Sequence, residues 1–198
     1  YASLYTSLGC PFTCTFCCIN AEFKAALSDN KLGVSDKNEH VLMKAMDNTK
    51  PTIRYWSSDA IIKHIDYLVN KHHVKHLKFI DEMFVLDKKH VNGIADKIIE
   101  RRYDLNIWAY ARVDTLEDRK LLDNIKKAGI NWLVVGIESG SKHVRDGAKK
   151  KYGNEAIFNA IRRVQEAGIY VVGNYIYGLP DDTHETMKET LDLAKELN

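Results

Sequence analysis

The chain has 198 residues, of which 45% are hydrophobic and 28% are charged, and its formal net charge is +2. This composition predicts one ordinary globular domain with a sizeable core, spanning residues 1–198. The 29 basic residues are interleaved with 27 acidic ones, so the charge gives no electrostatic argument for a nucleic-acid partner. No apolar stretch approaches the roughly 20 residues of a membrane helix, which predicts a soluble protein without a membrane partner.

The first apolar segment, residues 2–8, is expected to form a strand, and three cysteines follow it closely. Cys10, Cys14 and Cys17 are separated by three and two residues, and Cys18 adjoins the last of them. This spacing allows a short loop to wrap one compact inorganic core, which indicates an iron-sulfur cluster. Three thiolates on a four-iron cluster leave one iron open for a non-protein ligand, and an open metal position is typical of a catalytic site.

Other interpretations of the cysteines stay open at this point. A zinc site would need a further ligand such as histidine, because the chain has no second Cys-x-x-Cys pair. A disulfide is less favoured, because all four cysteines lie close together and a chain of this length does not need stapling. Cys18 is expected to pack beside the cluster, since adjacent side chains diverge. Reduced thiols imply a reducing compartment, so we expect a cytoplasmic protein.

Residues 19–56 are polar and interrupt the pattern of apolar elements on either side of them. They are predicted to be a long insertion between the cysteine loop and the first helix. Loops longer than about 15 residues are uncommon unless they are functional or disordered. A lid over the site and a tolerated surface insertion are therefore both expected possibilities.

After this insertion, helical and strand patterns alternate. Helices are expected at residues 58–71, with Ser58 as the cap, and then from Asp87, Thr115, Asn154 and Thr183. Apolar runs between them predict strands at residues 77–80, 107–111, 132–137 and 170–177. Gly129 and Gly168 follow alanines at two helix ends, where glycine suits the left-handed cap before a strand. The lysine run at residues 149–151 is expected to form a solvated turn between helices.

The alternation of strands and helices determines the expected fold class. Runs such as residues 133–135 are apolar on both faces of a strand, as in buried parallel sheets. The sequence therefore predicts a parallel α/β fold that is closed or partly closed.

Polar residues follow the predicted strands at their carboxyl ends, where parallel α/β folds bind ligands. Apart from the cysteines, these residues are Asp81, Glu82, Arg112, Asp114, Glu138, Ser139 and Gly178. Simpler explanations exist, because Asp81-Glu82 can form a solvated loop and Arg112 can pair locally with Asp114. Gly136 and Gly140 bracket Glu138-Ser139 and permit close approach of the backbone to a ligand. We therefore expect one ligand site at this edge of the sheet.

The chain resembles the radical S-adenosylmethionine (radical SAM) enzymes over nearly its whole length. Cys10-x-x-x-Cys14-x-Phe16-Cys17 is similar to the cluster signature of that family, including the aromatic residue before the last cysteine. The resemblance implies a partial (β/α)6 TIM-like barrel of parallel strands. The full family core has six strands and five are predicted here, which we interpret as truncation at the C-terminal end.

The resemblance also implies the cofactors. A 4Fe-4S cluster would be held by Cys10, Cys14 and Cys17, and S-adenosylmethionine (SAM) would bind the open iron. In the family, an electron from the cluster splits SAM into methionine and a 5'-deoxyadenosyl radical, which takes hydrogen from the substrate. An electron donor such as flavodoxin or ferredoxin is the implied partner.

Individual SAM contacts follow from the same resemblance. Phe16 is expected against the adenine, Asp81-Glu82 match the motif that holds the methionyl amino group, and Glu138-Ser139 match the motif that meets the ribose and methionyl part. The stretch with Gly173, Ile176 and Gly178 is similar to the family's adenine-contacting segment. Arg112 is expected to reach the carboxylate of SAM. No catalytic residue on the substrate side is predicted.

The segments Asp81-Glu82-x-Phe84 and Trp108-Ala109-Tyr110-Ala111-Arg112 look most like the subgroup that carries a cobalamin-binding domain ahead of the radical core. That subgroup contains methyltransferases together with ring-forming and rearranging enzymes, so cobalamin-dependent methyl transfer is one expectation. The alternatives are a tRNA methylthiotransferase-like or porphyrinogen-oxidase-like radical SAM enzyme and a non-enzymatic iron-sulfur or zinc module. The sequence indicates no substrate.

Overall fold

The computed structural model describes residues 1–19 and 53–198. Its centre is a five-stranded sheet in which all neighbouring strands are parallel and the order follows the chain, β1-β4-β5-β6-β7. The strands are β1 (Ala2–Leu4), β4 (His76–Phe79), β5 (Asn106–Arg112), β6 (Ile130–Glu138) and β7 (Tyr170–Tyr175). The predicted parallel α/β fold is confirmed.

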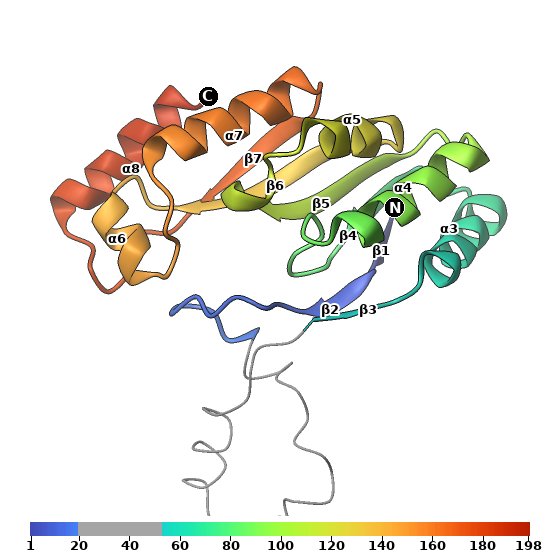
Figure 1. Cartoon of the computed structure of the whole chain (residues 1–198), viewed down its shortest axis with the longest axis horizontal. Helices are drawn as coiled ribbons and strands as arrows, with labels where there is room; N and C mark the ends of the chain where they lie inside the picture. The colour runs from blue at the N-terminus through green and yellow to red at the C-terminus, as the bar shows by residue number, and fades with distance from the viewer. Residues whose placement is uncertain (20–52) are drawn as a thin grey trace, which may run out of the picture.

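Helices cover one face of this sheet. They are α3 (Ser58–His72), α4 (Lys88–Arg101), α5 (Arg119–Lys127), α7 (Asn154–Glu166) and α8 (His184–Glu196). The short helix α6 (Lys142–Gly147) belongs to a separate small apolar cluster through Val144. Figure 1 shows α4, α5 and α7 along one side of the sheet and the N-terminal loop on the opposite side. Ile65, Ile94, Ile125 and Ile161 of the covering helices are at most 3% exposed. An apolar layer therefore fixes one side of the sheet and leaves its carboxyl edge for polar groups.

The opening segment is divided between two sheets, so the prediction of one strand at residues 2–8 is wrong. β1 ends at Leu4, and β2 (Ser7–Gly9) pairs antiparallel with β3 (Ile53–Tyr55) in a separate two-stranded sheet. The chain turns away because polar groups of Thr6 and Ser7 bind a buried carboxylate at the end of β4, as described below. β3 lies within the predicted insertion, and residues 20–52 of that prediction lie outside the described residues.

Two of the predicted helix caps are confirmed, and two others, Ser58 and Asn154, are shifted by one residue. The carboxylate of Asp87 accepts from the His90 N–H at 2.6 Å, and Thr183 caps α8. In α3, the hydroxyl of Ser57 accepts from the Ala60 N–H, so Ser58 is the first helical residue. A serine hydroxyl that accepts from a backbone N–H in the first turn is a preferred N-cap, so the type of cap is as predicted.

The helix start predicted at Thr115 is wrong, whereas Asn154 is the first residue of α7 and not its cap. Thr115 ends the short 3-10 helix η1 (Val113–Thr115) and its hydroxyl donates to the Arg112 carbonyl at 2.9 Å. α5 begins instead after Asp118, whose carboxylate accepts from the Leu121 N–H. Asn154 lies inside α7, after the N-cap Gly153, and accepts from Arg145 at 2.6 Å.

Glycines at the helix-to-strand turns have the expected left-handed backbone. Gly129 and Gly168 have φ of 89° and 75°. A Cβ on Gly129 would lie 2.3 Å from the Leu105 carbonyl oxygen, so no other residue fits there without movement of the chain. These turns return each helix to the start of a parallel strand. The carboxyl ends of the strands consequently share one edge of the sheet.

Candidate active site

The three predicted ligand cysteines lie on a loop that follows β2 at the carboxyl edge of the sheet. Cys10 and Cys14 are half-buried, whereas Cys17 and Cys18 are exposed. The Cys17 N–H donates to the Cys14 carbonyl at 3.1 Å, which closes a turn between these two ligands. The loop is therefore folded on itself, as its cysteine spacing requires.

A cavity of about 160 Å³, which we call the cysteine cavity, lies between this loop and the strand ends. Its lining consists of Cys10, Phe12, Cys14, Phe16, Cys17, Ile19, Glu82, Met83, Arg112, Glu138 and Lys150. The cavity brings together all three predicted cysteines and the predicted residues Phe16, Glu82, Arg112 and Glu138. Within the described residues, Cys18, Asp81, Ser139, Ile176 and Gly178 do not line it.

The electrostatics of the thiols favour a cationic group between them. Burial raises the pKa of Cys10, and the charges of Cys14 and Cys17 raise it further, while a Phe12 backbone hydrogen bond and the Arg112 cation oppose this. A thiol becomes a thiolate when it binds metal, so a metal would offset this shift at Cys10. The donor set at this cavity therefore fits an iron-sulfur cluster.

The arrangement of the donors also bears on the zinc alternative. In the part of the chain that the structure describes, no three His, Cys, Asp or Glu side chains gather closely enough to hold a metal ion. The three cysteines nevertheless line one cavity. Each thiolate of a four-iron cluster binds a different iron, so separated sulfurs suit such a cluster better than a single ion.

Arg112 enters the cavity from the end of β5 and is only 4% exposed. Its Nε and Nη2 each donate to a carboxylate oxygen of Asp114 at 2.9 Å, and its guanidinium lies 3.8 Å from the Phe12 ring centroid. Nη1 donates to the Cys14 sulfur at 3.4 Å. Burial disfavours the charged form, but the hydrogen bonds and charge of Asp114 outweigh it and raise the pKa of Arg112. A fixed cation thus lies beside a ligand cysteine.

Glu138 and Lys150 form a buried ion pair at the end of β6. The ammonium of Lys150 donates to Glu138 Oε1 and to the Gly136 carbonyl at 3.3 Å, and the two residues are 6% and 4% exposed. A Cβ on Gly136 would lie 2.8 Å from that ammonium, so this glycine makes room for the pair. Glu138 itself has φ of 70°, a strained backbone for a side chain of this kind.

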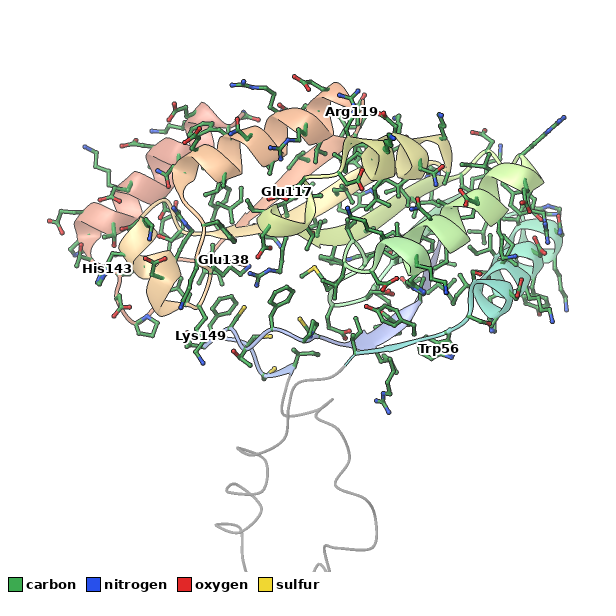
Figure 2. All side chains as sticks on the ribbon, viewed as in Figure 1. Trp56, Glu117, Arg119, Glu138, His143 and Lys149 are labelled. Atoms are coloured by element: carbon green, nitrogen blue, oxygen red, sulfur yellow. The ribbon has the colours of Figure 1, made fainter. Side chains whose placement is uncertain are left out.

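The predicted solvated turn at residues 149–151 is therefore wrong for Lys150. Figure 2 shows Glu138 and Lys149 on the side of the molecule that holds the cysteine loop. The Lys150 ammonium also lies 5.9 Å from the Phe16 ring centroid. A lysine run normally indicates exposure, and the one signal against it was Gly136, which allows close approach. Sequence reasoning missed both Lys150 and Phe12.

Asp81 and Glu82 point in different directions. Asp81 is 1% exposed and accepts from the Thr6 N–H at 2.6 Å, the Thr6 hydroxyl at 2.5 Å and the Ser7 hydroxyl at 2.8 Å. Burial raises the pKa of Asp81, although these hydrogen bonds oppose the shift. Glu82 lines the cavity and accepts from the Gly9 N–H at 3.1 Å. Asp81 thus holds the segment before the cysteines, while Glu82 faces the site.

Ser139 is fully buried away from the cavity. Its hydroxyl lies 3.1 Å from the Thr190 hydroxyl of α8 and accepts from the Ser141 N–H at 3.1 Å. Ile176 packs against the small apolar cluster of Val144, Ala148 and Leu179. The Gly178 N–H donates to Asp182 at 2.8 Å, which places that acid at the turn before α8. None of these three predicted residues lines the cysteine cavity.

A larger cavity of about 380 Å³ opens on the helix side of the sheet, between α7, β7 and α8. Its lining includes Ile137, Ile161 and Val171 but no cysteine or acidic residue. It lacks the metal-ligating chemistry of the smaller cavity, so we assign it no function. In the described part of the chain, no helix has the length and apolar character needed to cross a membrane.

The sequence was compared with those of known proteins. An uncharacterized methyltransferase of Pyrococcus horikoshii is 25% identical over 198 residues, which cover 100% of this chain and 37% of that protein. The anaerobic magnesium-protoporphyrin IX monomethyl ester cyclase of Rubrivivax gelatinosus is 28% identical over 193 residues, which cover 96% of this chain and 30% of that protein. This chain therefore spans well under half the length of these relatives.

The fold was compared with solved structures. The radical S-adenosylmethionine methyltransferase TsrM from Kitasatospora setae, with cobalamin and a 4Fe-4S cluster bound, superposes with a TM-score of 0.75 at 19% identity. The match covers 99% of this chain and 32% of that one, and it identifies the five-stranded sheet as a partial radical SAM barrel.

A family match identifies the chain. The sequence matches the Radical SAM superfamily over residues 4–194, a range that includes all three cavity cysteines. The family implies a 4Fe-4S cluster and SAM, and the cavity offers donors of the required kind. The chain therefore belongs to the radical SAM superfamily.

Proposed function

We propose that this chain is the catalytic core of a radical SAM enzyme, with a 4Fe-4S cluster on Cys10, Cys14 and Cys17. The supporting observation is that these cysteines share one cavity with Glu82, Arg112 and Glu138 from three strand ends. When bound, the cluster supplies the electron that cleaves SAM to methionine and a 5'-deoxyadenosyl radical. The substrate that receives the radical is not part of this proposal.

The residues of the chain would bind and shield SAM. Glu82 and Glu138 offer carboxylate oxygens to its amino and hydroxyl groups, and the Lys150 ammonium lies where a carboxylate can accept a hydrogen bond. Phe16 offers an apolar ring on the same cavity wall. Buried walls exclude water from a reactive radical. In this proposal the side chains of Asp81 and Ser139 support the site without touching SAM.

An electron must reach the cluster from outside. Cys17 is exposed on the described loop, so the cluster would lie near the protein surface. We propose a small one-electron donor such as flavodoxin or ferredoxin as the partner.

For the reaction itself we propose cobalamin-dependent methyl transfer. Two observations support it: TsrM is a methyltransferase with bound cobalamin, and the Pyrococcus horikoshii relative is named a methyltransferase. The Rubrivivax gelatinosus relative is named a cyclase, so the reaction class needs its own test. Cobalamin would be bound by a part of the protein outside this chain.

Anaerobic reconstitution of the full-length protein tests the core proposal. We expect about four irons per chain and release of 5'-deoxyadenosine when SAM and a reductant are added. The Cys14→Ala variant serves as the negative control. A wild-type protein that carries a full cluster and binds SAM without cleaving it under reductant would contradict the proposal.

Cobalamin is tested separately on the same protein. We expect hydroxocobalamin to remain bound after gel filtration and its absorbance to change on reduction. If SAM cleavage occurs without cobalamin binding, methyl transfer by this route is excluded and the radical SAM core stands.

A further inference from the structure

Arg112 is held in one orientation by groups on three sides. Asp114 accepts two parallel hydrogen bonds, from Nε and Nη2 at 2.9 Å each. Phe12 stacks on the face of the guanidinium at 3.8 Å from its centroid. A planar guanidinium bound bidentately and stacked on a ring has little freedom to turn, so its remaining nitrogen has a fixed direction.

That remaining nitrogen points at a cluster ligand. Nη1 of Arg112 lies 3.4 Å from the sulfur of Cys14 and donates to it. Asp114 is 41% exposed at its side chain whereas that of Arg112 is 5% exposed, so the donor is on the buried side of the pair. A lysine in this position could not keep both the paired carboxylate and the sulfur contact, because an ammonium lacks the planar fork.

We propose that Arg112 is a positioning residue that donates a hydrogen bond to the Cys14 thiolate and thereby raises the reduction potential of the cluster. This inference rests on the proposed function, since it requires the cluster on the three cysteines. Reduction adds one negative charge to the cluster and its sulfurs. Hydrogen bonds to the sulfurs stabilise that charge, and the effect is stronger at a buried site of low dielectric.

Arg112 could shift the reduction potential through its charge or through its hydrogen bond to sulfur, and Asp114 distinguishes the two. Asp114 balances the formal charge of Arg112, so the pair adds little net charge near the loop. The hydrogen bond to sulfur is therefore expected to be the larger contribution. This assignment differs from the sequence expectation, in which Arg112 reached the carboxylate of SAM.

The test is a redox titration of the full-length, anaerobically reconstituted protein without SAM, followed by electron paramagnetic resonance of the reduced cluster. For Arg112→Gln we expect the reduction equilibrium constant to fall about tenfold, a midpoint more negative by about 59 mV for one electron. Arg101→Gln is the matched control, because Arg101 makes the same fork with Asp66 away from the cysteines. Its midpoint should equal that of the wild type.

Iron content separates the possible failures. Wild-type protein without a cluster would overturn the proposed function and this inference with it. Arg112→Gln protein with full iron and an unchanged midpoint would overturn the inference alone.

A second measurement does not depend on any variant. In wild-type protein grown with 15N-arginine, hyperfine spectroscopy of the reduced cluster should detect a weak coupling to an arginine nitrogen. Absence of that coupling in a fully loaded protein would also overturn the inference, even if Arg112→Gln failed to bind iron.

Discussion

Neighbouring residues at the strand ends face two different surroundings. Glu82 and Glu138 line the cysteine cavity, whereas Asp81 and Ser139, each adjacent to one of them, are buried against other parts of the chain. In each pair the other side chain has partners away from the cavity: Asp81 accepts from Thr6 and Ser7, and Ser139 binds Thr190 and Ser141. A polar pair at a strand end therefore supplies one residue to the site and one to the fold.

Substitutions of residues that line the cavity (the cavity side) and of residues buried against other parts of the chain (the packing side) should have opposite effects. Changes on the cavity side should affect cofactor binding and leave the unfolding free energy nearly unchanged, unless they break a buried charge pair. Changes on the packing side should lower stability and leave SAM affinity unchanged once the protein is folded.

The largest effect is expected at the cysteines. Cys14→Ala should abolish cluster binding, because Cys14 lines the cavity and receives the Arg112 hydrogen bond. Cys18→Ala should retain wild-type iron content, since Cys18 does not line the cavity as described. Iron per chain after anaerobic reconstitution measures both. Loss of iron in Cys18→Ala would reverse the assignment of ligands.

The next largest effect is expected on the free energy of unfolding, when the buried Glu138–Lys150 ion pair is broken. Lys150→Met should lower the unfolding free energy by about 3–5 kcal/mol, because it leaves a buried carboxylate without its partner. Denaturant unfolding of cluster-free protein measures the loss. Adding Glu138→Gln should recover part of it, since the isolated charge is then removed.

A surface pair serves as the control for that experiment. Lys142 and Asp146 form an ion pair one helical turn apart, with side chains 63% and 40% exposed. Lys142→Met should leave the denaturation midpoint unchanged. Equal losses for the buried and the surface lysine would show that Lys150 is not held as the structure describes.

Asp81 and Glu82 provide a direct contrast between the two sides. Asp81→Asn should cost about 2 kcal/mol of stability, because the amide replaces an oxygen that accepts hydrogen bonds from Thr6 and Ser7. Glu82→Gln should keep the wild-type stability and weaken SAM binding roughly tenfold, the loss of one charged hydrogen bond. Thermal unfolding and equilibrium binding of SAM separate them. The same response in both variants would contradict the contrast.

Ser139→Ala should lower stability by a smaller amount and leave SAM affinity unchanged. Removal of the hydroxyl leaves the Ser141 N–H and the Thr190 hydroxyl with one partner fewer, at a cost of about 1 kcal/mol. The SAM affinity of the cluster-loaded variant should equal that of the wild type. A weaker affinity with unchanged stability would place Ser139 on the cavity side.

The smallest effect concerns the pH dependence of stability through His90. Its Nε2 lies 3.0 Å from the Thr6 hydroxyl that donates to Asp81. Burial lowers the pKa of His90, while the charges of Asp81 and Asp87 oppose the shift. The unfolded state then binds the proton more readily, so His90 should reduce stability as pH falls below about 6.5, the ordinary histidine value. Unfolding of wild type and His90→Gln between pH 8 and 5 compares the slopes. A steeper acid loss in the variant would contradict this sign.

The helix side of the sheet was predictable from the sequence because apolar burial leaves a periodic pattern. The apolar run in β6 indicates a buried strand, and the regular apolar spacing in α4 and α7 indicates helices that pack against the sheet. Helix boundaries were less predictable. Thr115 and Asn154 have the chemistry of caps, but the Thr115 hydroxyl donates to the Arg112 carbonyl and the Asn154 side chain accepts from Arg145.

The position of the cysteine cavity was predictable from the sequence, but the list of residues that line it was incomplete. Cysteine spacing and strand ends indicated where the site would form. Lys150 was missed because its burial depends on space left by Gly136 and on the backbone of Glu138, which are properties of the folded chain. The break after β1 did carry a signal, since Thr6 and Ser7 are two consecutive polar residues between Tyr5 and Leu8.

The most direct test of the central claim asks whether three cysteines leave one iron open for SAM. Electron-nuclear double resonance of the reduced, full-length protein can be recorded with SAM labelled with 15N at the amino group or 17O at the carboxylate. We expect strong couplings to both labels, in wild type and in Cys18→Ala alike. A fully loaded cluster without coupling to either label would contradict it.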